Sequence, residues 1–350
     1  MNREAILNLR PNKRRSRDAE AGADSEYAYV VAELRQLRAA SQLSRYRGAA
    51  PRLPSREAIS EIVGSLISAL YPRHFGPPAL DARDADAFVA RTLAKALPAL
   101  KQQIELALSL EQEDARDPAN ANRRSAGDIT RLFAAALPKI RAALDKDVRA
   151  AFANDPSAKS IDEVIFCFPG VAAIMRHRLA HNLYRLGAPL LARIIAEIAH
   201  ALAGVDIHPG AEIEEGFFID HGTGVVIGET AVIGRNVRIY QAVTLGAKRF
   251  EVGGDGELRK SYPRHPIVED DVVIYAGATI LGRITIGRGS SIGGNVWLTE
   301  TVPPGSRITQ AKTQASKGGH SIQTTRSPQI NAGAPIGGSP SPGRRFSLPT

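Results

Sequence analysis

The 350-residue sequence predicts an α+β protein in which an N-terminal α-helical domain is followed by a parallel β-helix of hexapeptide repeats. Two observations carry this prediction. Apolar residues recur at helical spacing up to about residue 203, and a six-residue apolar period then runs from Ile207 to Leu298. An amphipathic helix needs apolar residues at i, i+3, i+4 and i+7, so the six-residue period argues against a helical second half.

Composition divides the chain into four segments. Residues 1–25 are polar and basic, and residues 312–350 are rich in Ser, Gly and Pro, so we expect both ends to be disordered. Residues 26–203 are expected to form the α-helical domain. Residues 204–311 are expected to form the β-helix, which a loop at 247–266 interrupts.

The helical domain contains several amphipathic stripes of apolar residues. Pro98 and Pro138 stand within two of these stripes, and each is expected to kink or end its helix. Two last helices, at about residues 171–186 and 189–203, lead into the β-helix. A glycine follows each of them and is expected to serve as a C-terminal cap.

The β-helix is predicted from thirteen branched aliphatic residues on one six-residue period, with a two-residue slip before Ile227 and a loop before Val268. Each short strand of such a solenoid points one aliphatic side chain inward and stacks on its neighbours. Three strands make one coil, and successive coils lie about 4.8 Å apart. The thirteen positions are Ile207, Ile213, Ile219, Ile227, Ile233, Ile239, Leu245, Val268, Ile274, Ile280, Ile286, Ile292 and Leu298.

Composition and charge argue against several classes of protein. No apolar run approaches the roughly 20 residues of a membrane span, and no secretory leader is evident, so we expect a cytoplasmic protein without a membrane segment. The net charge of +9 arises partly from the ends and comes without a nucleic-acid reading motif, so no nucleic-acid partner is expected. The lone Cys167 cannot form an internal disulfide, and we expect it to be buried.

No metal is expected either. His177 and His181 stand four residues apart on a predicted helix, a spacing that suits metal ligands. No third ligand is evident nearby, and two arginines crowd the pair with positive charge. We therefore interpret both histidines as packing or surface residues.

Five segments of the second half together closely resemble serine O-acetyltransferases, which are hexapeptide-repeat acyltransferases. The resemblance covers about residues 150–305. It implies a left-handed parallel β-helix and an enzyme that transfers acetyl from acetyl-CoA to the hydroxyl of L-serine, giving O-acetyl-L-serine and CoA in cysteine biosynthesis. The segments are Val205–Pro209 (VDIHP), Ile219–Gly224 (IDHGTG), Ile227–Ala231 (IGETA), Val243–Gly246 (VTLG) and Arg264–Pro266 (RHP).

The attack of an alcohol on a thioester needs a base within hydrogen-bond reach of the hydroxyl. His221 is the candidate, because imidazole titrates at about pH 6.5 and small residues surround this histidine in its segment. Asp206 lies fifteen residues earlier, which is nearly one coil, so the two side chains could approach each other across adjacent coils. A carboxylate there would fix the imidazole tautomer and stabilise the imidazolium.

The resemblance assigns four acceptor-binding residues. Asp155, in the helical domain, and Asp220 match positions that bind the amino acid. Arg264 and His265 match the pair that holds its carboxylate, for which a planar guanidinium is well shaped. The segment Lys248–Tyr262 before this pair is longer and more charged than the glycine-rich stretch of the family, so we expect its contacts to differ.

The resemblance also implies partners. Acetyl-CoA is placed in a groove between subunits, against the backbone at Ala276 and Gly294, which implies a homotrimer or a dimer of trimers. Cysteine is expected as a feedback inhibitor, because it carries the same ammonium and carboxylate groups as serine. Relatives that bind O-acetylserine sulfhydrylase insert a C-terminal isoleucine. This chain ends at Thr350, so we do not expect that partner to bind by the same route.

Two alternatives stay open. One is acetyl transfer to another small hydroxyl acceptor, such as homoserine or a sugar, although the charges at the acceptor-binding positions favour an amino acid. Another is a noncatalytic scaffold of the cysteine synthase complex, which would not need His221. A zinc hydratase on the same β-helix is not expected, because His208, His221 and His265 lack the spacing that its three zinc ligands would need.

Overall fold

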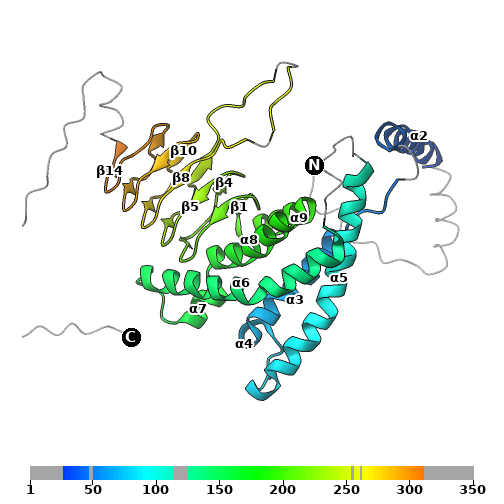
Figure 1. The fold of residues 1–350 in the computed structure, drawn as a ribbon, viewed down its shortest axis with the longest axis horizontal. Helices are drawn as coiled ribbons and strands as arrows, with labels where there is room; N and C mark the ends of the chain where they lie inside the picture. Colours follow the sequence, from blue (N-terminus) through cyan, green and yellow to red (C-terminus); the bar gives the residue numbers. More distant parts are fainter. Residues whose placement is uncertain (1–26, 47–49, 114–123, 254–255, 261, 311–350) are drawn as a thin grey trace, which may run out of the picture.

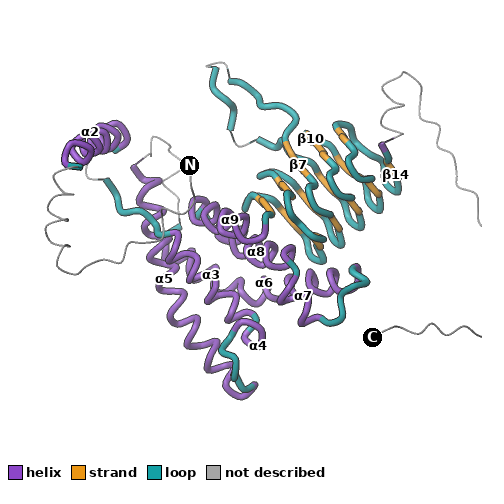
Figure 2. Tube along the Cα trace, turned by 180° about the vertical axis from the view of Figure 1, so that it is seen from behind, coloured by secondary structure: helices purple, strands orange, loops and turns teal. Residues whose placement is uncertain are grey.

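A helical half is followed by a β-helix, as the sequence predicts (Figure 1). Helices α6, α8 and α9 lie at one end of the β-helix, and the coils stack away from them toward β14 (Figures 1 and 2). The two end segments predicted to be disordered lie outside the described residues. This computed structural model describes residues 27–46, 50–113, 124–253, 256–260 and 262–310.

The helical half is held together by the apolar stripes of its helices, which share one continuous core with the β-helix. Helix α3 illustrates the pattern: Ile59, Ile62 and Leu66 are buried, and the Ser55 side chain caps the helix by accepting a 3.1 Å hydrogen bond from Ala58. The elements are α2 (Ala28–Arg45), α3 (Arg56–Leu70), α4 (Pro72–Phe75), η1 (Ala82–Asp84), α5 (Ala85–Glu113), α6 (Ala126–Asn154), α7 (Ile161–Cys167), α8 (Pro169–Leu186) and α9 (Pro189–Ala203).

Neither Pro98 nor Pro138 ends its helix, so that part of the expectation is wrong. A proline inside a helix removes one backbone hydrogen bond. Both helices nevertheless continue, because buried residues flank each proline: Leu100 follows Pro98, while Leu137 precedes Pro138 and Ile140 follows it. Tertiary packing therefore outweighs the local break.

The two predicted helices before the β-helix are confirmed as α8 and α9. Each ends at a glycine in the left-handed conformation, Gly187 with φ of +101° and Gly204 with φ of +66°. Glycine adopts this conformation without steric strain, which suits it to helix C-terminal caps. The second cap directs the chain from α9 into the first strand.

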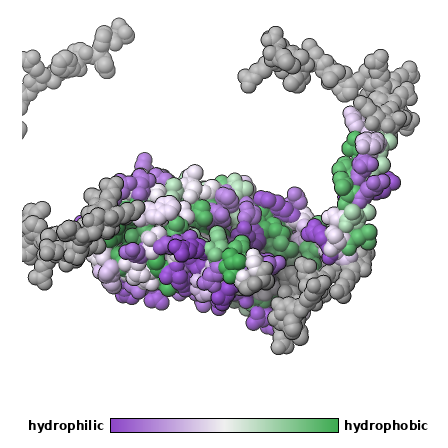
Figure 3. Space-filling model, turned by 90° about the horizontal axis from the view of Figure 1, so that it is seen from above, coloured by the Kyte–Doolittle hydropathy of each residue, from purple (hydrophilic) through white to green (hydrophobic). Residues whose placement is uncertain are grey.

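Two apolar features of the helical half face solvent. Helix α2 buries none of its residues, and Val30, Leu34 and Leu37 are exposed on it. In the space-filling view α2 stands away from the body and carries hydrophobic residues (Figure 3). Cys167 is exposed as the last residue of the short helix α7, so the expectation that it is buried is wrong. Among the described helices, none has the combined length and apolar character of a membrane span.

The β-helix has three parallel faces, which we call A, B and C. From β1 to β13, consecutive strands belong to consecutive faces, so the chain turns from one face to the next after each strand. Face A contains β1 (Val205–Ile207), β4 (Val225–Ile227), β7 (Thr244–Gly246), β10 (Thr279–Leu281) and β13 (Trp297–Leu298); face B contains β2 (Glu212–Ile213), β5 (Val232–Ile233), β8 (Ile267–Val268) and β11 (Thr285–Ile286); face C contains β3 (Phe218–Ile219), β6 (Arg238–Ile239), β9 (Val273–Ile274), β12 (Ser291–Ile292) and β14 (Arg307–Ile308).

The thirteen predicted aliphatic positions all fall in these strands, and all are buried except Ile213, which is partly buried. Strand pairing places them directly above one another. On face A, the pairs run in register from Ile207 through Ile227, Leu245 and Ile280 to Leu298. The six-residue period is therefore the spacing between inward side chains on successive faces, and every third inward side chain returns to the same face.

Candidate active site

His221 lies where the chain passes from face C to face A, between β3 and β4. Its backbone is left-handed, with φ of +60°, which is uncommon for a residue with a side chain and costs about 1 kcal/mol or more. The following Gly222 packs closely: a Cβ there would lie 2.9 Å from Cγ2 of Val205. This tight turn leaves 70% of the His221 side chain exposed, so the imidazole is accessible to substrates.

Asp220 is the acidic neighbour of His221. Its Oδ1 lies 3.8 Å from Nε2 of His221, and its Oδ2 accepts a 2.9 Å hydrogen bond from Nη2 of Arg238. Asp155, at the C-terminal end of α6, is close enough for its charge to interact with His221 and Arg238. Hydrogen bonds from the hydroxyl and backbone N–H of Ser157 hold the pKa of Asp155 below its ordinary value. One predicted acceptor-binding carboxylate thus lies beside the predicted base, and a second is near enough for its charge to act on that base.

Asp206 lies on β1, one coil from His221. The two backbones are neighbours, because Val205 contacts Gly222. Asp206 faces outward on face A, in register with Val226. Among the contacts of the described residues, no hydrogen bond or ion pair joins Asp206 to His221. Asp220 is the carboxylate closest to His221 in this structure.

Ala276 and Gly294 lie on the same edge as His221, further along the β-helix. Backbone hydrogen bonds of 2.8 to 3.0 Å join successive turns of this edge. A Cβ on Gly294 would lie only 3.2 Å from the carbonyl oxygen of Ala276, so these two turns pack closely against each other. We call this ladder the His221 edge; its turns are residues 220–224, 240–242, 275–277 and 293–295.

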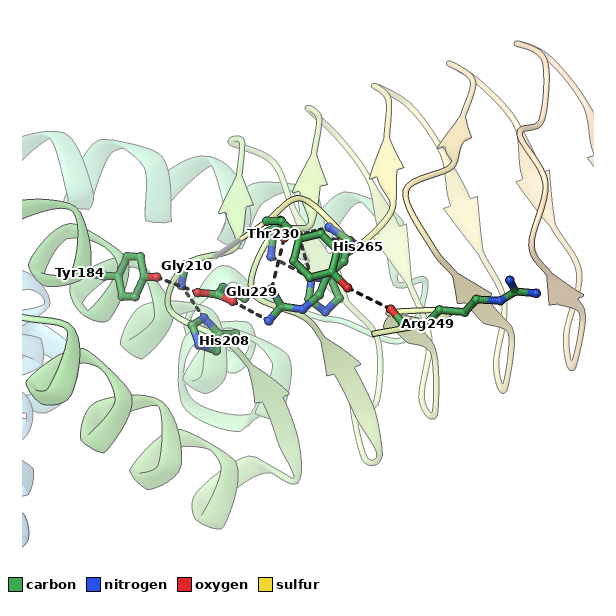
Figure 4. Close-up of polar contacts among 9 residues, drawn as sticks. Tyr184, His208, Gly210, Glu229, Thr230, Arg249 and His265 are labelled. Carbon is green, nitrogen blue, oxygen red and sulfur yellow. Dashed lines mark hydrogen bonds and ion pairs between the residues drawn. The ribbon is translucent and has the colours of Figure 1, made fainter. Parts of the chain in front are cut away.

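Arg264 and His265 lie on a different edge, where the chain passes from face A to face B and where the loop 247–266 returns to the coil. Thr230 fixes them there: its Oγ1 accepts the backbone N–H of Arg264 at 2.9 Å and that of His265 at 3.1 Å. Thr230 and His265 lie together in the close-up (Figure 4). We call this the Arg264 edge; its turns are residues 208–210, 228–230, 262–266 and 282–283.

The Arg264 guanidinium is held by an acidic partner. Its Nη2 lies 2.6 Å from Oε2 of Glu229, and the Tyr184 hydroxyl donates a 3.0 Å hydrogen bond to Oε1 of the same carboxylate (Figure 4). Although burial opposes ionisation, the hydrogen bonds from Arg264 and Tyr184 hold the pKa of Glu229 below its ordinary value. Because Tyr184 belongs to α8, the helical half directly supports this edge.

The ring of His265 has a defined tautomer. Its Nδ1 accepts the backbone N–H of Thr230 at 3.0 Å, so the proton of the neutral ring is on Nε2. Burial, and then the charge of Arg264, lower the pKa of His265 to about 4. The ring lies against Gly228, where a Cβ would come within 2.1 Å of Nε2. His265 is thus a neutral hydrogen-bond donor near pH 7.

Four residues that support the site were not identified from the sequence. Glu229 and Thr230 lie in the segment IGETA, so the sequence marked their region as part of the site. It did not show which residues they contact. Tyr184 and Arg238 are single residues in a helix and a strand. Nothing in their sequence surroundings distinguishes them, because their roles arise only from contacts with distant segments.

The two edges do not meet within one chain. The His221 edge joins faces C and A, and the Arg264 edge joins faces A and B. The strands of face A therefore lie between them, with Val226 and Thr244 pointing outward in register. A molecule as small as an amino acid cannot bridge both edges of a single β-helix.

The predicted histidine pair in α8 packs within the fold. His177 is buried, its ring centroid lies 5.7 Å from that of His181, and Nδ1 of His181 is hydrogen-bonded to the carbonyl oxygen of Pro209 at 2.9 Å. In the part of the chain that the structure describes, no group of three or more His, Cys, Asp or Glu residues is placed to hold a metal ion.

Comparison with known proteins places the chain in a family. Residues 265–300 match the family described as bacterial transferase hexapeptide (six repeats). A plasmid serine acetyltransferase of Synechococcus elongatus is 57% identical over 263 residues, which span 74% of this chain and 82% of the relative. The serine acetyltransferase of Mycobacterium tuberculosis is 52% identical over 166 residues, which span 47% of this chain and 69% of the relative.

Solved structures agree with the sequence comparison. The crystal structure of Entamoeba histolytica serine acetyltransferase 1 in complex with L-cysteine gives a TM-score of 0.61 at 34% identity, covering 74% of this chain and 88% of that chain. Isoform 3 from the same organism, in complex with cysteine, gives 0.60 at 31% identity, covering 79% and 87%. Its helical half, its hexapeptide coils and these matches show that the chain belongs to the serine acetyltransferase family of acyltransferases.

Proposed function

We propose that this chain transfers the acetyl group of acetyl-CoA to the hydroxyl of L-serine, giving O-acetyl-L-serine and CoA. The observation that carries the proposal is the exposed His221 beside the carboxylates of Asp155 and Asp220, in a chain of the serine acetyltransferase family. A base next to fixed negative charge suits an acceptor that carries both a hydroxyl and an ammonium group. A neutral sugar would gain nothing from that charge.

His221 is the proposed base. Its neutral imidazole accepts the proton of the serine hydroxyl while the oxygen attacks the thioester carbonyl. The collapse of the tetrahedral intermediate breaks the carbon–sulfur bond, and the imidazolium returns its proton to the CoA thiolate. We assign Asp206 the role of orienting the ring from the neighbouring coil, and Asp220 the role of contacting the substrate ammonium. The adjacency of Val205 and Gly222 supports the first assignment.

The acceptor carboxylate is assigned to Arg264 and to Nε2–H of His265. Because these residues lie on a different edge from His221, we infer that the Arg264 edge of one subunit faces the His221 edge of another. A homotrimer, alone or paired as a dimer of trimers, satisfies this requirement with every subunit equivalent. Mixing chains that carry His221→Ala with chains that carry Arg264→Ala tests this. Each variant alone should be nearly inactive, and mixed oligomers should regain activity, whereas no regain would argue for a site within one chain.

Acetyl-CoA is assigned to the His221 edge, against the backbone of Ala276 and Gly294. The absence of bulky side chains at these two positions fits a long, narrow co-substrate that lies along the ladder. When bound, acetyl-CoA supplies the activated acyl group. The resident side chains supply the base and the acceptor site.

Cysteine is assigned to the same acceptor site as an inhibitor. Two relatives of known structure are described in complex with cysteine. Cysteine has the ammonium and carboxylate of serine, so the same groups would bind it. Millimolar cysteine should therefore raise the apparent KM for serine without changing the extrapolated kcat. Binding of O-acetylserine sulfhydrylase is not assigned, because the C-terminal residues lie outside the described part of the chain.

The decisive experiment measures CoA thiol release from acetyl-CoA with L-serine, homoserine or a simple galactoside as acceptor. Serine should be the preferred acceptor, and His221→Ala should lower kcat/KM about 100-fold or more, the usual contribution of a general base. Preference for homoserine or the galactoside would redirect the assignment to another hydroxyl acceptor. An absence of release with all three acceptors would favour a scaffold role.

Asp206→Asn and Asp220→Asn separate the roles of the two carboxylates. Asp206→Asn removes the orienting group, so it should lower kcat with little change in the KM for serine. Asp220→Asn removes the contact with the substrate ammonium, so it should mainly raise the KM for serine. The reverse pattern would exchange the two assignments, in agreement with the 3.8 Å approach of Asp220 to His221.

A further inference from the structure

Arg238 contacts Asp220 on the His221 edge, although Arg238 belongs to none of the sequence motifs. It lies on β6, in register with Phe218 on the preceding coil of face C. Its Nη2 donates a 2.9 Å hydrogen bond to Oδ2 of Asp220, and the two side chains are only 20% and 11% exposed. An ion pair so well shielded from water is stronger and more rigid than one at the surface.

Aromatic rings fix the guanidinium in place. Its central carbon lies 4.6 Å from the ring centroid of Tyr240 and 5.3 Å from that of Phe218. Tyr240 in turn stacks on Tyr275 of the next coil, with centroids 5.2 Å apart and planes inclined by 14°. A guanidinium packed against aromatic faces gains cation–π attraction and loses rotational freedom. One ring of the preceding coil and one ring of its own coil therefore hold the guanidinium, and the second ring is itself stacked on the next coil.

The two carboxylate oxygens of Asp220 have different neighbours. Oδ2 is engaged by Arg238, whereas Oδ1 lies 3.8 Å from Nε2 of His221. The carboxylate cannot rotate about its last bond without losing the Arg238 contact. One oxygen is thus anchored, and the other stays on the side of the base.

We propose that Arg238 is a positioning residue for acetyl transfer, which anchors Asp220 so that its free oxygen faces His221 and the ammonium group of the acceptor. This inference rests on the proposed function. The positive charge of Arg238 also acts on Asp155 from α6, on Asp220 from the turn after β3, and on Tyr240.

Arg238→Met tests the proposal, because methionine keeps an unbranched side chain between the rings and removes the charge and the hydrogen bond. The KM for serine should rise about tenfold, the usual effect of losing one charge-assisted hydrogen bond, whereas the KM for acetyl-CoA should stay within about twofold. Because Asp220 is assigned to the substrate ammonium and His221 itself is unchanged, kcat should change much less than the serine KM.

Two variants complete the design. Arg238→Lys keeps the charge and should recover only part of the serine KM, because an ammonium cannot replace a planar guanidinium between two rings. Arg288→Met is the control. It removes an arginine–aspartate contact of the same length, 2.9 Å to Asp270, from another edge of the β-helix, and should leave the serine KM and kcat unchanged.

The proposal can fail separately from the proposed function. Inactivity of the wild type with serine would overturn the function, and crystal structures of the wild type and Arg238→Met would still decide the role of Arg238. An Asp220 carboxylate that turns away from His221 in the variant supports the anchor. An Asp220 carboxylate in the same position in both structures, or a serine KM in the variant within about twofold of the wild-type value, would overturn it.

Discussion

The Asp147 carboxylate accepts hydrogen bonds from Nε and Nη2 of Arg178, at 2.6 and 2.8 Å. The pair joins α6 to α8, and the side chains are 1% and 10% exposed. The same guanidinium donates to the carbonyl oxygens of Ile213 and Glu214, and the backbone N–H of Phe217 donates to Asp147. One buried ion pair therefore connects two helices to the first coil of the β-helix.

Asp147→Asn should lower the free energy of unfolding by about 3 to 5 kcal/mol, because it leaves the Arg178 charge buried without its counter-ion. Urea denaturation of the purified protein measures this. Asp128→Asn is the control: its contact with Arg131 is exposed, so its loss should leave the stability nearly unchanged. Equal losses in the two variants would show that Asp147 and Arg178 contribute no more than a surface pair.

Gly228→Ala should impair acceptor binding. The added methyl would overlap the ring of His265, whose Cδ2 and Nε2 lie 2.0 and 2.1 Å from the ideal Cβ position, so the ring must move. We expect the serine KM to rise about tenfold or more, which corresponds to about 1.4 kcal/mol. Steady-state kinetics with varied serine measures this.

Gly64→Ala is the matched control for that substitution. Gly64 lies in α3, and a Cβ there meets no atom within 4 Å. The variant should keep the wild-type KM and gain up to about 1 kcal/mol of stability, because alanine favours helix more than glycine does. A serine KM unchanged by Gly228→Ala would mean that His265 does not contact the acceptor.

The stability of the protein should fall as the pH is lowered below about 6.5. His265 has a pKa of about 4 in the folded chain because of burial and the charge of Arg264, against about 6.5 when unfolded. Between these values the unfolded chain binds a proton that the folded chain does not, so acid favours unfolding. Burial lowers the pKa values of His177, His181 and His208 as well, which adds to the effect.

Comparing wild type with His265→Gln in urea at several pH values isolates the contribution of His265. The free energy of unfolding of the variant should depend less steeply on pH between about 6.5 and about 4, since glutamine does not titrate. Identical slopes would show that the His265 ring titrates alike in the folded and unfolded chains.

Tyr184→Phe should weaken acceptor binding without affecting the chemical step. The variant loses the 3.0 Å hydrogen bond to Glu229, which holds Arg264. A lost hydrogen bond of this kind costs about 1 kcal/mol, or about fivefold in the serine KM, with kcat nearly unchanged. Tyr29→Phe in the exposed helix α2 is the control. A large fall in kcat would instead indicate that Tyr184 acts in catalysis.

The hexapeptide repeat allowed the β-helix to be predicted in detail, because the one inward side chain of each strand appears in the sequence as an aliphatic residue at every sixth position. All thirteen aliphatic positions fall in strands. The helical half was predicted less completely. The continuation of α6 through Pro138 depends on core contacts with distant helices, which local propensity does not contain.

The candidate site was likewise predicted only in part. His221 and Asp220 are adjacent in the sequence and in space, so a motif was enough to link them. The anchoring of Asp220 by Arg238, eighteen residues later, required the register of the coils to be known. His221 and Arg264 lie on different edges because their turns connect different pairs of faces. No sequence motif shows which two faces a turn connects.

The His221 edge also acts as a molecular ruler. Each coil adds about 4.8 Å, so the three steps from the turn of His221 to that of Gly294 give a span of about 14 Å. The number of coils sets that span, and most substitutions on the outer surface leave it unchanged. Removing one coil between the two turns would shorten the span by about 4.8 Å. A co-substrate of fixed length could then contact the turn of His221 or the turn of Gly294, but not both.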